Sequence, residues 1–345
     1  MSRSDPSLFV KHTGSDVLAL LLYVDDIILT GSSDALIQEV IDDLSLMFEL
    51  KNLGLLTYFL GIQISYPSSG GIFVNQYKYA KELLPKAGMT QCKACSTPCK
   101  PYSQVLSTEG ELLKDTTLYR RLVGALRYLT FTRPVIAFAV NSVCQYMTAP
   151  TDSHFFQVKR ILRYLQGTLQ YGINFSLGPM QLSAFSDADW AGDASTCRTT
   201  TGFVVFLGNN PISWQSKKQG SVSCSSTEAD YQALANTAAD IVWIRQVLAY
   251  MHEFLPEPPL LHCDNLSVLT LSSNRVFYLH IKHLDIDFHF IRERVQHKDF
   301  HVQQFTKGLH GPIFSKHCIN LRLGHPAEIE GGCLAKGYSA RKVVS

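Results

Sequence analysis

The clearest pattern along the chain is two runs of aliphatic residues that flank a pair of carboxylates. Residues 20–24 and 27–30 are typical of buried strands, and Asp25 and Asp26 stand between them. The pattern predicts a hairpin with two acidic side chains at its tip. Because Mg²⁺ prefers hard oxygen ligands, this tip is a candidate metal site. A hairpin turn in which Asp is merely a turn former is the alternative interpretation.

Around this hairpin, the pattern of apolar positions predicts helices and strands in turn. Residues 34–50 carry apolar side chains every three or four positions, which predicts an amphipathic helix. Residues 57–66 predict a strand, residues 72–74 a second short strand, and residues 77–87 a helix. Residues 1–16 are polar, and residues 91–110 have the composition of a linker.

The middle of the chain is mostly helical in pattern. Residues 119–167 predict helices, with breaks at Arg133-Pro134 and Ala149-Pro150. Basic residues on these helices indicate either contact with a nucleic-acid backbone or a solvated basic face. They are Arg120, Arg121, Arg127, Lys159, Arg160 and Arg163.

The last third predicts a unit that mixes strands and helices. Strands are expected at residues 182–187, 202–207, 211–215 and 260–263. A long helix is expected at residues 227–251 and a further one near residues 285–296.

Composition limits the class of protein. A chain of 345 residues with 46% apolar and 17% charged residues predicts about two globular domains. A net charge of +2 excludes a protein that binds nucleic acid by bulk charge, although not one that lines a single channel with cations. The apolar run at residues 17–24 is far shorter than the ~20 residues of a membrane-spanning helix, so no membrane partner is expected.

Nine cysteines without a signal-like amino terminus predict reduced thiols and an intracellular location, whether cytoplasmic or nuclear. Cys92, Cys95 and Cys99 form the tightest cluster, which is interpreted as free cysteines rather than a zinc site, because no second ligand pair follows nearby. A group of histidines near the end of the chain, His280, His283 and His289, is interpreted in the same way as surface side chains.

Longer motifs carry a resemblance to a known family. Tyr23-Val24-Asp25-Asp26 and the residues after it resemble the palm hairpin of a reverse transcriptase of the copia type of LTR retrotransposon. Further motifs keep the order of that family over roughly residues 5–317. They are Lys51-Asn52-Leu53-Gly54, Tyr58-Phe59-Leu60-Gly61-Ile62, Thr97-Pro98, Tyr119-Arg120-Arg121-Leu122-Val123-Gly124, Leu129-Thr130-Phe131-Thr132-Arg133-Pro134, Lys159-Arg160-Ile161-Leu162-Arg163-Tyr164-Leu165 and Phe185-Ser186-Asp187-Ala188-Asp189-Trp190-Ala191-Gly192.

The resemblance implies an α+β and α/β architecture in four parts. Residues 1–98 correspond to a partial reverse transcriptase palm, an antiparallel sheet with helices. Residues 99–177 correspond to a helical connection, residues 178–310 to a ribonuclease H-like domain with a mixed sheet, and residues 311–345 to a divergent tail.

The resemblance also implies two sites that use Mg²⁺ or Mn²⁺. Asp25 and Asp26 are the palm carboxylates, while Asp187, Glu228 and Asp264 are the catalytic, metal-binding carboxylates of a two-metal nuclease. The expected partners are an RNA–DNA hybrid or template-primer and the other Pol segments of a full-length element. Contact with nucleic acid is expected at Tyr23, Lys217 and Lys218.

Each nuclease residue has a structural alternative. Asp187 and Asp189 are also common turn formers at a strand end. Ser225-x-x-Glu228 also fits a helix capping box, and Asp264-Asn265 also fits a helix cap. Lys217-Lys218 also fits an exposed charged turn.

The chain departs from the family pattern in two places. Only 22 residues precede Tyr23, so the upstream palm strand with a further metal-binding Asp is missing, and no DNA synthesis by this chain alone is expected. Near residue 304, about ten residues that carry a fourth nuclease carboxylate are also missing, with Asp285 and Asp287 as the nearest substitutes. Two functions therefore remain: a Pol fragment with polymerase-type and ribonuclease H chemistry, or an inactive remnant that keeps the fold and at most binds nucleic acid.

Overall fold

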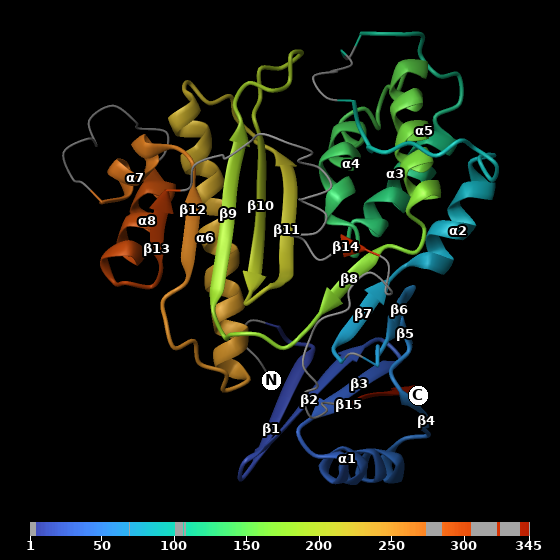
Figure 1. Cartoon of the computed structure of the whole chain (residues 1–345), viewed down its shortest axis with the longest axis vertical. Coiled ribbons are helices and arrows are strands. Elements are labelled where there is room, and N and C mark those ends of the chain that lie inside the picture. The colour runs from blue at the N-terminus through green and yellow to red at the C-terminus, as the bar shows by residue number, and fades with distance from the viewer. Residues whose placement is uncertain are drawn as a thin grey trace.

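In the computed structural model, the described residues form three five-stranded sheets, with helices packed on them and between them (Figure 1). It describes residues 5–68, 70–100, 106, 108–273, 285–304, 323–324 and 339–344. An α+β fold with antiparallel and mixed sheets was the prediction, and it is confirmed.

The first sheet contains the acidic hairpin and is covered on one face by helix α1. Its strand order is β1-β2-β3-β15-β4. The elements are β1 (Leu8–Thr13), β2 (Asp16–Tyr23), β3 (Asp26–Gly31), α1 (Asp34–Met47), β4 (Lys51–Leu55) and β15 (Ser339–Val344). Ile37 and Ile41 of α1 pack on Leu29 and Val343 of the sheet, and burying such side chains contributes about 1.5–3 kcal/mol each.

The sequence pattern did not indicate two strands of this sheet. Residues 1–16, interpreted as polar, contain the strand β1, which begins with Leu8, Phe9 and Val10 and pairs with the backbone of β2 along six residues. Residues 339–344, within the tail that remains predicted to be divergent, form β15, which pairs with β3 on one side and β4 on the other.

The second sheet joins segments that are far apart in the sequence. Its strands are β5 (Tyr58–Phe59), β6 (Ile62–Ser65), β7 (Ile72–Asn75), β8 (Gly172–Phe175) and β14 (Leu323–Gly324), in the order β14-β8-β7-β6-β5. The single strand predicted at residues 57–66 is wrong. Leu60 and Gly61 both have positive φ, so the chain reverses there and forms a hairpin.

The helical part agrees with the predicted helices and breaks. It contains α2 (Tyr77–Lys86), α3 (Thr117–Leu129), the 3₁₀ helix η1 (Pro134–Ile136), α4 (Ala137–Cys144) and α5 (Asp152–Gly167). The predicted break at Arg133-Pro134 lies between α3 and α4. Arg133 has a non-helical backbone, with φ −136° and ψ 68°, because a residue before proline is disfavoured in the α region.

Several basic residues of these helices bind the protein itself. Arg163 Nε donates to the carbonyl of Lys93 at 2.8 Å, and Arg160 Nη2 donates to Thr97 Oγ1 at 2.7 Å. Both contacts fasten the segment predicted as a linker to α5.

The third sheet forms the mixed α/β unit predicted for the last third of the chain. It has the order β11-β10-β9-β12-β13, with β9, β10 and β11 antiparallel and β12 parallel to both β9 and β13. Its strands are β9 (Leu182–Asp189), β10 (Thr200–Leu207), β11 (Asn210–Lys218), β12 (Leu260–Cys263) and β13 (His301–Gln304). Its helices are α6 (Ser226–Tyr250), α7 (Leu266–Ser273) and α8 (Asp285–Gln296).

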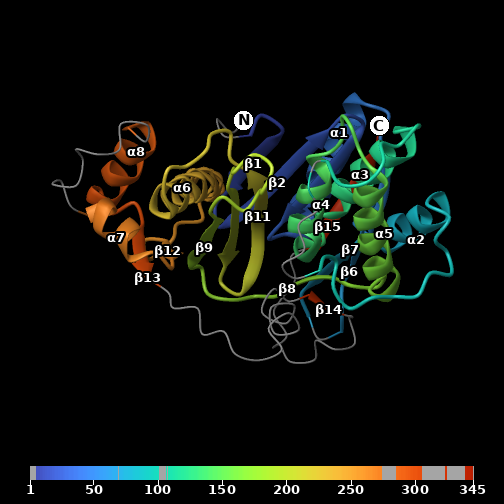
Figure 2. The ribbon, with the colours of Figure 1, turned by 90° about the horizontal axis from the view of Figure 1, so that it is seen from above.

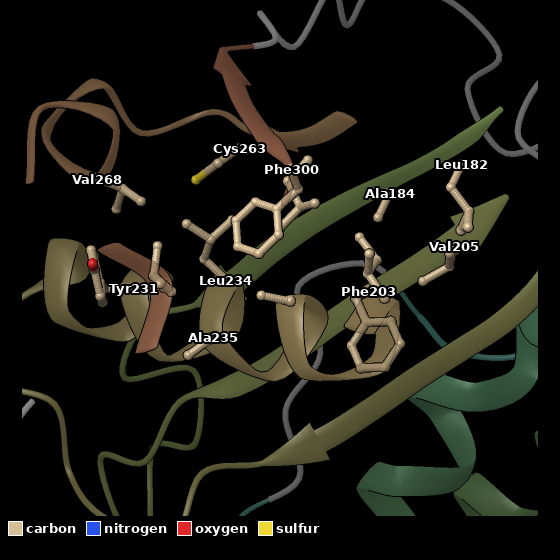
Figure 3. Close-up of a cluster of buried hydrophobic side chains, with 14 of the residues drawn as sticks. Leu182, Ala184, Phe203, Val205, Tyr231, Leu234, Ala235, Cys263, Val268 and Phe300 are labelled. Carbon is tan, nitrogen blue, oxygen red and sulfur yellow. The ribbon is translucent and has the colours of Figure 1, made fainter. Parts of the chain in front are cut away.

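Helix α6 packs along one face of this sheet and is seen nearly end-on in Figure 2. Leu234 and Ala238 of α6 contact Ala184, Val205 and other side chains of the sheet in one buried cluster (Figure 3). This packing fixes both the position of α6 and its rotation relative to the ends of β9 and β12.

Candidate metal centre

Three carboxylates converge at one edge of the third sheet. Asp187, Asp230 and Asp264 each offer a carboxylate oxygen, and these oxygens all lie within 4.8 Å of one another. Asp187 is exposed, Asp264 is partly exposed, and Asp230 is buried. In the ranges that the structure describes, no other group of three or more acidic, cysteine or histidine side chains is placed to share a metal ion.

Strand register brings two of these residues together. In the parallel pair β9–β12, Cys263 lies opposite Ser186. Asp187 and Asp264 each follow one member of that pair, and the carboxyl ends of parallel strands meet at the same sheet edge. The convergence of Asp187 and Asp264 thus follows from the strand pairing.

Asn265 caps the N-terminus of α7 and also hydrogen-bonds to Asp230. Its Oδ1 accepts from the backbone N–H of Ser267 at 2.9 Å, and its Nδ2 donates to Asp230 Oδ2 at 2.9 Å. In the predicted Asp264-Asn265 cap, Asn265 therefore makes the capping contact, while Asp264 belongs to the carboxylate group.

Helix α6 contributes Asp230 to this group, where the resemblance to the family implies Glu228. The Glu228 Oε2 atom accepts a hydrogen bond from the backbone N–H of Cys224 at 2.8 Å, and Ser225 Oγ accepts from the N–H of Glu228 at 3.1 Å. Glu228 thus stabilises the first turn of α6, close to the capping box considered as its alternative, but bonded one residue earlier.

Sequence periodicity could not have separated these two residues. Glu228 and Asp230 lie two positions apart, so they point about 200° apart around the helix. Both lie about one helical turn before a buried apolar residue of α6: Glu228 before Tyr231, and Asp230 before Leu234. The spacing of apolar residues therefore fits either carboxylate. Only the packed rotation of α6 decides which carboxylate meets Asp187.

The three carboxylates create a strongly negative environment. Burial, together with the nearby charges of Asp230, Asp264 and Asp187, raises the pKa of the Cys263 thiol to about 11. Burial, together with the charge of Asp187, also raises the pKa of Asp189. Such a concentration of negative charge favours a bound cation.

The donor set fits a hard divalent cation. All three groups offer carboxylate oxygens, which are the ligands that Mg²⁺ and Mn²⁺ prefer, and none offers sulfur or imidazole. Asp187, Asp230 and Asp264 are thus the residues that could hold such an ion.

The acidic hairpin of the first sheet has a different environment. Val24 turns the chain with a φ of 52°, and Tyr23 pairs with Asp26 in the strand register. Asp26 Oδ1 lies 3.0 Å from Nζ of Lys342, which comes from the tail strand β15. The predicted carboxylate pair is thus at the tip of a hairpin, with Asp26 in an ion pair.

The residues predicted to contact nucleic acid have unequal exposure. Tyr23 is half exposed and packs edge-on against Phe59, with ring centroids 6.2 Å apart. Lys217 is exposed near the end of β11. Lys218 instead forms an ion pair with Asp193 and donates to Gln145 Oε1 at 3.0 Å. Its ammonium group therefore binds other residues of the protein.

The substitutes considered for a fourth nuclease carboxylate do not join the group. Asp287 is partly buried on α8, which raises its pKa, and it is not among the three converging carboxylates. Asp285 begins α8. Of the histidines noted in the sequence, His289 lies on α8, whereas His280 and His283 fall outside the described residues.

Comparisons with known proteins agree with the motifs. Residues 2–101 match the family model described as reverse transcriptase (RNA-dependent DNA polymerase). The chain is 44% identical over 296 residues to the retrovirus-related Pol polyprotein from transposon RE1 of Arabidopsis thaliana, covering 86% of this chain and 20% of that protein. It is 33% identical over 314 residues to the corresponding polyprotein from transposon TNT 1-94 of Nicotiana tabacum, covering 88% of this chain and 23% of the relative.

Other matches are shorter. An uncharacterized mitochondrial protein of Arabidopsis thaliana is 51% identical over 226 residues, which is 65% of this chain and 93% of that protein. Among solved structures, LC11-RNase H1, isolated from compost, aligns over 37% of this chain and 86% of its own, with 15% identity and a TM-score of 0.29. The chain spans about a fifth of the length of the transposon polyproteins that it matches. Within the described ranges, no helix combines the length and the apolarity needed to cross a bilayer.

Proposed function

Because the chain belongs to the Pol polyproteins of copia-type retrotransposons, we propose that its last third hydrolyses the RNA strand of RNA–DNA hybrids. The observation that carries the proposal is the convergence of Asp187, Asp230 and Asp264 within 4.8 Å. Strand β9, helix α6 and the turn after β12 supply these carboxylates, and a group of this kind can hold divalent cations for phosphodiester chemistry.

The chain's own residues prepare the site in distinct ways. Asp187 and Asp264 are fixed by the parallel strands, and Asp230 is held by the Nδ2 group of Asn265. Bound Mg²⁺ or Mn²⁺ would lower the pKa of an attacking water and stabilise charge on the leaving oxygen. The exposed Asp187 is the carboxylate that a substrate phosphate would approach first, while the buried Asp230 anchors the site from the protein side.

The first sheet fits the other half of a Pol protein. We assign Asp25 and Asp26 to the palm hairpin, where they would serve polymerisation together with other Pol segments in a full-length element. The family match over residues 2–101 supports this assignment.

A second candidate is a protein that binds hybrids without cutting them. In the described part of the chain, three carboxylates form the group, and the resemblance to the family implies that a segment with a fourth is missing near residue 304. Losing one carboxylate of a two-metal site would weaken the second ion most.

Cleavage of a labelled RNA–DNA hybrid by the purified chain in Mg²⁺ or Mn²⁺ separates these candidates. We expect cleavage that Asp187→Asn abolishes and Glu228→Gln preserves. Hybrid binding without cleavage by a folded protein would favour the second candidate. Cleavage that survives Asp187→Asn would contradict the proposed site.

A further inference from the structure

The C-terminal strand β15 lies between β3 and β4 in the first sheet. It pairs with β3 along six residues, from Ser339 opposite Gly31 to Val344 opposite Asp26. On its other edge it pairs with β4, where the register shifts between Arg341 and Val343. A segment near the end of the chain therefore separates two strands that are neighbours in the sequence (Figure 1).

The two faces of β15 make different contacts. Val343 is fully buried in the core with α1, and Arg341 Nη1 donates to Gln38 Oε1 of α1 at 2.9 Å. Because side chains alternate along a strand, Lys342 points to the opposite face, which α1 does not cover. There its Nζ lies 3.0 Å from Asp26 Oδ1 and 5.8 Å from the centre of the Phe59 ring.

This placement puts a fixed cation on the acidic hairpin. The side chains of Lys342 and Asp26 are 15% and 21% exposed, so water screens the pair only weakly. An ammonium group on a carboxylate oxygen opposes a divalent cation at the same oxygen, both by occupying it and by charge repulsion.

We propose that β15 is a built-in inhibitory strand, which masks the palm carboxylates through the Lys342–Asp26 ion pair. The core contacts of Val343 hold β15 between β3 and β4, and Lys342 blocks cation binding at Asp26. The inference rests on the assignment of Asp25 and Asp26 as a cation site. Withdrawal of β15 would free Asp26 for a divalent cation.

Manganese binding to the full chain tests the inference. Asp187→Asn and Asp264→Asn are introduced first, so that the carboxylate group of the third sheet does not contribute. Lys342→Met is then compared with Arg341→Met, a matched change on the other face of the same strand, by Mn²⁺ titration followed by electron paramagnetic resonance. We expect Lys342→Met to strengthen Mn²⁺ binding at least tenfold, and Arg341→Met to leave it within about twofold.

Two further variants make the result decisive. Adding Asp26→Asn to Lys342→Met should remove the gained binding, and Lys342→Arg should keep binding as weak as in the parent because the charge is retained. Circular dichroism of each variant establishes that it is folded. Equal Mn²⁺ binding by a folded Lys342→Met variant and its parent would overturn the inference, as would a gain that Asp26→Asn does not remove. Neither result depends on hybrid cleavage, so failure here is distinguishable from failure of the proposed nuclease.

Discussion

Asn265 Nδ2 donates a 2.9 Å hydrogen bond to Asp230 Oδ2, and so connects the end of β12 to helix α6. The same side chain caps α7 through the backbone N–H of Ser267. One residue thus positions the buried carboxylate of the candidate metal centre and fixes the helix that follows Asp264. Side chains that orient metal ligands in this way typically change metal affinity or activity by about 10–100-fold when removed.

Replacing Asn265 tests this positioning role. We expect Asn265→Ala to lower hybrid cleavage about 10–100-fold and to raise the Mn²⁺ concentration needed for half-maximal rate, because Asp230 loses its donor. Asn236→Ala is a suitable control, since Asn236 lies on α6 and donates to the backbone carbonyl of Gln232. Cleavage by Asn265→Ala at the rate of the control would show that Asp230 needs no such support.

The roles of Asp230 and Glu228 are separable by matched substitutions. Asp230→Asn removes a charged ligand atom and should lower cleavage on the order of 100-fold or more, with little loss of stability. Glu228→Gln weakens the contact to Cys224 N–H, so it should lower the free energy of unfolding by about 1 kcal/mol and leave cleavage within a few-fold. The measurements are hybrid cleavage and urea unfolding of both variants. The reverse pattern would restore Glu228 as the catalytic residue of α6.

The Cys263 thiol gives a test by pH. Its pKa is raised from about 9 to about 11 in the folded protein, chiefly by burial. Below pH 9 both the folded and the unfolded chain hold this proton, and the stability is complete. As the pH rises from 9 toward 11 the unfolded chain loses the proton first, so stability falls, by about 1.3 kcal/mol between pH 8 and pH 10.

Comparison with Cys263→Ala isolates this contribution. Urea unfolding at pH 8 and pH 10 should show a larger decrease for the parent than for the variant, by roughly 1 kcal/mol. An equal decrease in both proteins would indicate that the thiol titrates at its ordinary pKa.

The neighbouring lysines of β11 should respond differently to substitution. Lys218 binds Asp193 and Gln145, so Lys218→Met should lower the free energy of unfolding by roughly 1–3 kcal/mol. Lys217 is exposed, so Lys217→Ala should leave stability unchanged and weaken hybrid binding a few-fold, with a shallower salt dependence. Fluorescence anisotropy with a labelled hybrid measures the affinity. Unchanged affinity of Lys217→Ala would exclude this residue from the contact surface.

Local pattern was enough to predict most helices and strands. Strand β12 and helix α8 begin and end where the apolar periodicity and flanking residues predicted. The exceptions depend on strand pairing and turn geometry that the apolar pattern does not describe. Strand β1 lies in a stretch interpreted as polar, although it begins with Leu8, Phe9 and Val10, and it pairs with β2. Residues 57–66 reverse at Leu60 and Gly61, in a conformation that apolar alternation does not report.

The sequence by itself determined the family, the two acidic motifs and the order of strands and helices in the last third, because each depends on residues close together in the chain. Only the tertiary structure decided that Asp230 rather than Glu228 meets Asp187 and Asp264, because the rotation of α6 is set by its packing on the sheet. The position of β15 likewise depends on contacts between residues about 300 positions apart, such as Arg341 with Gln38. The apolar periodicity of either segment cannot predict such a contact, because the contact forms only when the two segments pack into a shared core.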